Sequence, residues 1–264
     1  MEFTVDGLPV YAATGGRPFD PARQPIVFLH GAAMDHSVWA LQTRWFAHHG
    51  RSVVALDLPG HGRSGGAPPA KVPAAAAWLW RALDQLKVAR ASLVGHSLGS
   101  LIALEAAGMA PERVEKLALL GAALPMAVND EFLGLAERND HKAHELMHDW
   151  AHARRSHMGG CRMPGIWLVG LDTRLTERAR PGVMHAGLSA CSDYPKEQGY
   201  EAARRLQAPV LVLVGERDQM TPPKPAFALA AQFANARVTT LPECGHMMMG
   251  EQPDETLDAL RSFL

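Results

Sequence analysis

The residues with the clearest chemical potential form a G-x-S-x-G motif, Gly95-His96-Ser97-Leu98-Gly99. An apolar run (residues 91–94) precedes the motif, and residues 100–107 after it have a helix-forming composition. This order predicts a strand, a sharp turn and a helix. Such a turn has no room for side chains at Gly95 and Gly99, and it raises the Ser97 hydroxyl at the carboxyl edge of a sheet. Ser97 is therefore a candidate nucleophile, and the start of the helix offers N–H donors for a developing oxyanion.

A serine nucleophile needs a base and an orienting acid, and two residues farther along the chain can supply them. Asp218 follows an apolar strand pattern at residues 210–214, and His246 follows the last strand pattern at residues 238–241. Nucleophile, acid and base therefore occur in this order along the chain, each beyond the end of a separate strand. The spacing predicts a catalytic triad of Ser97, Asp218 and His246.

The elements that must position these residues alternate between strand-like and helix-like segments. Apolar strand patterns occupy residues 26–29, 53–56, 91–94, 114–120, 210–214 and 238–241. Because helical patterns separate most of them, we predict an α/β fold with a doubly wound, mostly parallel sheet. Residues 3–5 and 8–11 flank a short turn and predict an antiparallel hairpin at the sheet edge.

One interval between strands is too long for a simple crossover. It runs from residues 114–120 to residues 210–214 and has about ninety residues, whereas a crossover needs roughly one or two dozen. The helical patterns inside it are broken at Gly159-Gly160, Pro164-Gly165 and Pro181-Gly182. We therefore expect a core made of residues 1–124 and 201–264, with a helical cap of residues 125–200 over the carboxyl edge of the sheet.

The composition favours a small-molecule partner. Hydrophobic residues make up 47% of the 264, and the net charge of −1 gives no reason to expect nucleic acid or an anionic membrane surface as partner. An odd number of irregularly spaced cysteines indicates neither a disulfide framework nor a zinc site (Cys161, Cys191 and Cys244). Neither a basic signal peptide nor an apolar run of about 18 residues occurs. We expect a cytoplasmic monomer or homodimer.

A second motif competes for attention, the H-E-x-x-H sequence His144-Glu145-Leu146-Met147-His148. On a helix it places two imidazoles on one face, as a zinc protease requires. The longer metalloprotease motif is not present, because Ala151 and Arg154 stand where it needs Gly and His. Opposite an apolar face, the helix would carry a histidine stripe of His141, His144, His148 and His152. We expect this stripe to face solvent and to bind no catalytic metal, with an adventitious surface metal site as the alternative.

With these motifs the chain resembles the α/β-hydrolase superfamily. The resemblance rests on His30-Gly31, Asp57-Leu58-Pro59-Gly60-His61-Gly62-Arg63-Ser64, Gly95-His96-Ser97-Leu98-Gly99, Gly215-Glu216-Arg217-Asp218 and Gly245-His246. It covers nearly everything except the cap. It implies that Ser97 attacks an acyl carbonyl, His246 carries the proton and Asp218 orients the imidazole. The N–H groups of Ala32 and Leu98 form the implied oxyanion hole, and no cofactor is implied.

Two details of that resemblance favour ester hydrolysis. Ser97 argues against dehalogenases and epoxide hydrolases, which have Asp as nucleophile, and Met247 resembles esterase-like members rather than ring-cleavage hydrolases, which typically carry Trp there. The apolar residues expected in the substrate pocket are Met34, Met247, Trp150 and Trp167. We therefore predict hydrolysis of a small, largely apolar ester. The alternatives are lactone or C–C bond hydrolysis, acyl transfer or perhydrolysis with the same triad, and a slow-turnover ligand receptor on the same fold.

Overall fold

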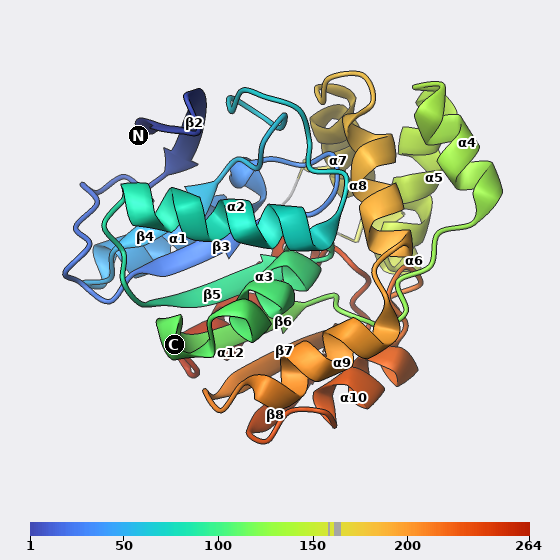
Figure 1. Cartoon of the computed structure of the whole chain (residues 1–264). Coiled ribbons are helices and arrows are strands. Elements are labelled where there is room, and N and C mark those ends of the chain that lie inside the picture. Colours follow the sequence, from blue (N-terminus) through green and yellow to red (C-terminus); the bar gives the residue numbers. More distant parts are fainter. Residues whose placement is uncertain (158, 161–164) are drawn as a thin grey trace.

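An eight-stranded sheet runs through the centre of the protein in the computed structural model (Figure 1). The structure describes residues 1–157, 159–160 and 165–264, so Cys161 and the predicted helix break at Pro164 lie outside the described residues. The strands are β1 (Glu2–Val5), β2 (Leu8–Ala13), β3 (Ile26–Leu29), β4 (Val53–Leu56), β5 (Ala91–His96), β6 (Val114–Leu120), β7 (Val210–Gly215) and β8 (Ala236–Leu241).

The strand order is β1-β2-β4-β3-β5-β6-β7-β8, and every pair from β4 to β8 is parallel. All residues of β3, β4, β5 and β7 are buried, as expected for strands that helices cover on both faces. At one edge, β1 and β2 form an antiparallel hairpin whose turn has positive φ angles at Asp6 (52°) and Gly7 (77°). The predicted doubly wound sheet with an edge hairpin is confirmed.

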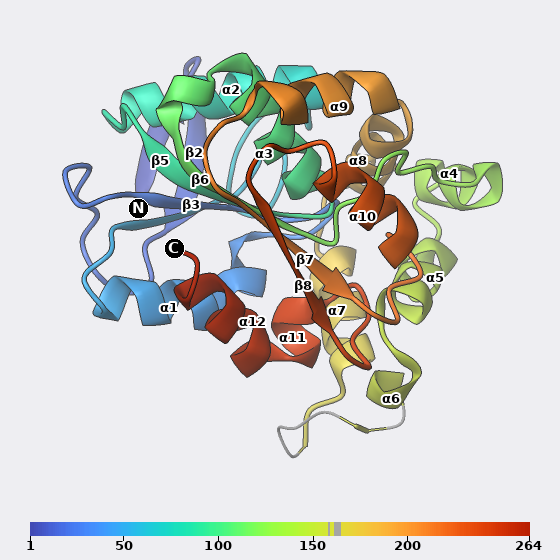
Figure 2. The same cartoon turned by 90° about the horizontal axis from the view of Figure 1, so that it is seen from below.

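Helices cover both faces of this sheet (Figure 2). One face carries α2 (Val72–Gln85), α3 (Leu98–Met109) and α9 (Lys196–Arg205), and the other carries α1 (Ala40–His48) and α12 (Pro253–Arg261). Shorter elements are η1 (His36–Trp39), η2 (Pro111–Arg113), α10 (Pro223–Ala230) and α11 (Met248–Glu251). Across the described residues, no helix combines the length and apolar character that a membrane crossing requires.

Between β6 and α9 the chain forms a group of short helices that gather at one end of the sheet (Figure 1). They are α4 (Asp130–Glu137), α5 (His141–Ala151), α6 (Arg154–His157), α7 (Leu168–Glu177) and α8 (Val183–Ser192). Capping side chains start two of them, because Asn129 accepts from the N–H of Phe132 and Asp140 from that of Lys142. We call these five helices the cap.

The prediction that the histidine stripe of α5 faces solvent is wrong. His148 and His152 are 0% and 1% exposed, although His141 stays exposed. The amphipathic pattern assumes a single buried face, but α4 packs against α5 and so does α7. Side chains of α7 provide hydrogen-bond partners for the buried imidazoles, which removes much of the cost of burying them.

Candidate active site

Ser97 sits in a strained turn between β5 and α3. Its φ and ψ angles are 53° and −120°, a conformation that a non-glycine residue rarely adopts. Ser97 is 7% exposed. A Cβ atom on Gly95 would collide with the carbonyl of Gly99, and one on Gly99 would lie 2.6 Å from the carbonyl oxygen of His30. The expected lack of room for side chains at both glycines is thus confirmed.

Asp218 and His246 lie in the loops that follow β7 and β8, and their side chains meet. The distance from His246 Nδ1 to Asp218 Oδ2 is 2.8 Å, and both side chains are at most 1% exposed. Because a carboxylate only accepts, this contact assigns the proton to Nδ1. The Nε2 atom of His246 is buried without a hydrogen-bond partner among the described residues. Its lone pair is therefore available to take a proton.

The histidine is held beside the serine turn by two independent contacts. His96 Nε2 lies 3.0 Å from the His246 carbonyl oxygen, with the two rings 4.6 Å apart. On its other side, the His246 ring packs closely against Gly121, where a Cβ atom would lie only 2.8 Å from His246 Cε1. The residue before it, Leu120, accepts the Ser97 N–H at its carbonyl (3.0 Å), which links this backbone to the serine turn. Burial lowers the pKa of His96 well below its usual value, so this imidazole is neutral and donates Nε2–H.

The two expected oxyanion donors flank the same turn. Leu98 is the first residue of α3, and Ala32 lies in the loop after β3, just before Ala33 with its φ of 59°. No acceptor within the described part of the chain takes a hydrogen bond from either N–H group. Helix α8 packs directly on this loop, since a Cβ on Gly187 would lie 2.8 Å from that of Ala32.

Ser97 opens into a cavity of about 150 Å³ between the sheet edge and the cap. Of the four residues expected in the pocket, Trp150 lines this cavity and packs edge-to-face on Phe132. The other three do not line it: Met34 is buried near Gly31, Met247 lines a separate cavity of about 370 Å³, and Trp167 is 63% exposed. Lining residues that the sequence did not suggest include Met126, Val128, Asn129, Leu188, Gln219 and Met220.

Thr221 is a further residue of this site that the sequence analysis missed. Its hydroxyl donates to Asp218 Oδ2 (2.6 Å) and lies 3.1 Å from His246 Nδ1, while its N–H donates to Asp218 Oδ1 (2.7 Å). An Asp followed three residues later by Thr is the pattern of a side chain that caps its own loop, so the spacing carried a usable signal. Thr221 therefore holds in place the carboxylate that contacts His246.

Glu251 connects the cap to the loop of His246, and no local sequence signal marks it. Its buried carboxylate accepts from the N–H groups of Gly245 (3.0 Å) and Ala153 (2.9 Å) and from the hydroxyl of Ser156 (2.8 Å). Beside it, the carbonyl of Ala151 at the end of α5 accepts the N–H of His246 (2.6 Å). The position of His246 therefore depends on the cap.

Among the residues that the structure describes, two groups of side chains have the residue types of a metal site. In the first group, Asp57 accepts hydrogen bonds from the backbone N–H and the Nδ1 atom of His36 (both 2.8 Å) and from the N–H of Arg63 (2.9 Å). These bonds explain the buried Asp57 as a residue that stabilises the loop after β4. The second consists of His148, His152 and Asp172 in the cap. Burial, with the neighbouring His152 and His144, lowers the pKa of His148 to about 3, so this imidazole is neutral.

Known proteins resemble the chain over most of its length. The pimeloyl-acyl-carrier-protein methyl ester esterase of Aromatoleum aromaticum is 28% identical over 251 residues, 88% of this chain and 95% of that one. The dihydrolipoyllysine-residue acetyltransferase component of the acetoin cleaving system of Pseudomonas putida is 31% identical over 91% of this chain, which spans 63% of that protein's length. A solved structure of an N-acyl homoserine lactone degrading enzyme has a TM-score of 0.80 at 27% identity, with 100% of both chains covered. Since a sequence model of the alpha/beta hydrolase family also matches residues 26–259, the chain belongs to that family as an esterase-like member.

Proposed function

We propose that the protein hydrolyses a carboxylic ester of a small, largely apolar substrate through an acyl-enzyme on Ser97. The observation that carries this proposal is the 2.8 Å contact of His246 Nδ1 with Asp218, which leaves the buried Nε2 atom with a free lone pair beside the serine turn. General esterase activity is also supported by the family and by the methyl ester esterase relative.

The proposed reaction has two acyl-transfer steps. His246 Nε2 takes the Ser97 hydroxyl proton while Oγ bonds to the acyl carbon, and the N–H groups of Ala32 and Leu98 stabilise the oxyanion. The intermediate then expels the alcohol, which receives its proton from His246. Water repeats the sequence on the acyl-enzyme and releases the acid. Asp218 keeps Nε2 free and stabilises the imidazolium that forms in each step.

The cavity at Ser97 supports a small substrate. Its volume of about 150 Å³ is modest, and Leu188, Trp150 and Met126 give it apolar walls, whereas Asn129 and Gln219 offer hydrogen bonds for orientation. From the sequence we also propose a monomer or homodimer in the cytoplasm that acts without nucleic-acid or membrane partners.

Lactone hydrolysis is the second candidate. It breaks the same acyl–oxygen bond with the same residues and differs only in that the alcohol stays attached to the product. The specific observation in its favour is the full-length likeness to the N-acyl homoserine lactone degrading enzyme.

A substrate panel with a matched variant tests both candidates. The panel contains p-nitrophenyl esters of graded acyl length and N-acyl homoserine lactones, assayed with the wild type and with Ser97→Ala. We expect short esters to be turned over best and Ser97→Ala to lose about 10⁴-fold or more in kcat with every substrate. An organophosphonate should label the wild type at Ser97 only. Unchanged turnover in folded Ser97→Ala protein would contradict the serine mechanism, and activity on lactones alone would favour the second candidate.

A further inference from the structure

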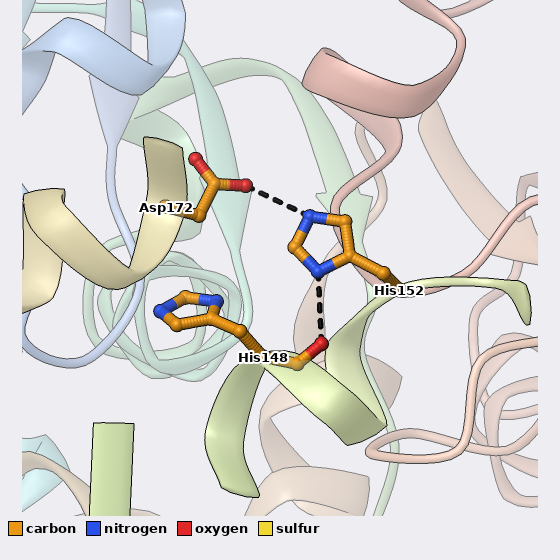
Figure 3. A group of neighbouring side chains, drawn as sticks. All are labelled: His148, His152 and Asp172. Atoms are coloured by element: carbon orange, nitrogen blue, oxygen red, sulfur yellow. Dashed lines mark hydrogen bonds and ion pairs between the residues drawn. The ribbon is translucent and has the colours of Figure 1, made fainter. Parts of the chain in front are cut away.

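Two histidines of α5 and an aspartate of α7 converge inside the cap. His148, His152 and Asp172 are all buried, and one nitrogen or oxygen from each lies within 4.8 Å of the others. Figure 3 shows the two imidazole rings and the carboxylate turned toward one another. The proposed triad does not use this cluster, because its base is His246 at the edge of the sheet.

The hydrogen bonds of His152 identify which of its two nitrogens carries the proton in the neutral form of the ring. Its Nδ1–H donates to the carbonyl oxygen of His148 at 2.9 Å, as the dashed line in Figure 3 marks. The Nε2 atom faces Asp172 Oδ2 at 2.9 Å. A carboxylate cannot donate, so a proton or another cation must lie between these two atoms.

The hydrogen bonds of His148 point its other nitrogen at the same place. The hydroxyl of Thr176 lies 3.1 Å from the carbonyl oxygen of Thr173, and His144 Nδ1 (3.0 Å) and His148 Nε2 (3.1 Å) both face it. With its one proton donated to Thr173, its oxygen accepts from His148 Nε2–H. This leaves a bare lone pair on Nδ1, which is buried and has no hydrogen-bond partner among the described residues. A buried polar atom without a partner is costly, and a bound ligand would remove that cost.

We propose that His148 Nδ1, His152 Nε2 and the Asp172 carboxylate bind one divalent transition metal ion of the zinc class. Two neutral imidazoles and a carboxylate suit such an ion, whereas Ca²⁺ and Mg²⁺ prefer oxygen donors throughout. Zinc binds these donors at about 2 Å, so a tetrahedral site needs them roughly 3.3 Å apart. The donors lie within 4.8 Å of one another, so binding has to draw them together by up to about 1.5 Å. Water would complete the fourth position.

The surroundings of the cluster are those that metal sites require. Each imidazole donates its outer N–H to a fixed oxygen, His152 to the carbonyl of His148 and His148 to the hydroxyl of Thr176, which holds the rings in place. Asp172 also lines the cavity of about 370 Å³, so an ion can reach the site from solvent.

The metal has a positioning role that goes beyond the proposed ester hydrolysis. It would join α5 to α7 at the end of α5, where the carbonyl of Ala151 holds the N–H of His246. Because the ion touches none of the reacting atoms, it would stabilise the cap without taking part in acyl transfer.

Metal titration of the full, tag-free chain tests this proposal. After chelator treatment, Co²⁺ is added and its visible absorption recorded, and Zn²⁺ is titrated in competition with a chromogenic chelator. We expect one ion per chain in the wild type, with an upward shift of Tm in Zn²⁺. Asp172→Asn and His148→Gln should each weaken binding by about 100-fold. His141→Gln, at an exposed position of the same helix, is the matched control and should bind as the wild type does.

Three outcomes would overturn the proposal. The wild type could show no stoichiometric Co²⁺ or Zn²⁺ binding, which would leave a buried His152–Asp172 ion pair alone. Asp172→Asn and His148→Gln, checked for folding by circular dichroism, could both bind like the wild type. Alternatively, His141→Gln could weaken binding as much as they do, which would move the ion to the surface. If one site variant fails to fold, the other variant and the wild-type Tm shift decide.

Discussion

Two buried histidine–aspartate pairs, one at the sheet edge and one in the cap, have almost the same length and opposite consequences. His246 contacts Asp218 through Nδ1 at 2.8 Å, and its Nε2 stays free. His152 contacts Asp172 through Nε2 at 2.9 Å, and its Nδ1 is taken by a backbone carbonyl. Only the first histidine has a nitrogen left for proton transfer. The type of contact alone therefore does not identify a catalytic base; the partner of the second nitrogen does.

The largest expected effect separates the two aspartates. Asp218→Asn removes the charge that fixes the tautomer of His246, so kcat should fall roughly 10³- to 10⁴-fold with little change in KM. Asp172→Asn, the same change in the cap, should leave kcat within about tenfold because Asp172 touches no reacting group. Steady-state kinetics on one p-nitrophenyl ester measures both.

Circular dichroism of both variants is the control for folding. The comparison would break if the two variants lost similar activity while folded, since the cap pair would then share in proton transfer. Asp57→Asn extends the test, because Asp57 braces a loop through His36 and should affect stability more than chemistry.

The next effect concerns the contacts of Glu251, which join the cap to the loop of His246. Glu251→Ala leaves the N–H groups of Gly245 and Ala153 without their acceptor, so the loop of His246 should shift relative to Ser97. We expect kcat to fall roughly 10- to 100-fold. Glu243→Ala, in the same loop but exposed and paired with Arg217, is the matched control and should stay within about threefold. Equal effects of the two substitutions would show that the Glu251 contacts do not position His246.

The same two regions differ in how well the sequence predicted them. The placement of Ser97, Asp218 and His246 at one edge of the sheet could be predicted, because each follows a strand and parallel strands all end at the same edge. His148 and His152 were predicted on the wrong side because α7, which covers them, comes from more than fifteen positions later in the chain and brings Asp172 with it. A single-helix pattern contains no information about such a second neighbour.

The residues that line the cavity at Ser97 were predicted poorly for a related reason. Met247 follows His246 directly, but α11 starts there and turns its side chain into the 370 Å³ cavity rather than toward Ser97. Trp167 is apolar and lies in the cap, yet it stays 63% exposed ahead of α7. Proximity in sequence therefore identified the loops of the site but not the directions of their side chains.

Acid should destabilise both regions by the same mechanism. Burial lowers the pKa of His61 in the core and of His148 in the cap to about 3, from the usual 6.5. Between these values the unfolded chain binds a proton that the folded chain does not, so lowering the pH below 6.5 favours unfolding. Each histidine should cost up to about 1.4 kcal/mol per pH unit.

Denaturant unfolding of metal-free protein at about pH 7, 6 and 5 measures this loss. His61→Gln and His148→Gln should each flatten the pH dependence, because glutamine does not titrate. His152 is expected to behave differently. Burial opposes its charge, but Asp172 raises its pKa overall, so its contribution to the free energy of unfolding is kept in acid and lost as the pH rises. A pH slope unchanged in both glutamine variants would contradict the assignment.

The smallest expected effect compares two threonines that hold the histidines of the two regions. Thr221 donates its hydroxyl to the Asp218 carboxylate (2.6 Å), whereas Thr176 accepts from His148. Thr221→Val keeps the shape and the backbone N–H bond to Asp218 but removes one donor. Since one hydrogen bond to a charged group is involved, kcat should fall roughly 3- to 10-fold. Thr176→Val should leave kcat within about twofold.

A variant that restores the hydroxyl distinguishes the lost hydrogen bond from a simple loss of packing. Thr221→Ser keeps the donor to Asp218 but lacks the methyl group, so it should recover most of the kcat that Thr221→Val loses. A packing defect would lower kcat in Thr221→Ser as well. If Thr221→Val and Thr176→Val both kept the kcat of the wild type, the hydroxyl at Asp218 would be structural, and the carboxylate alone would orient the base.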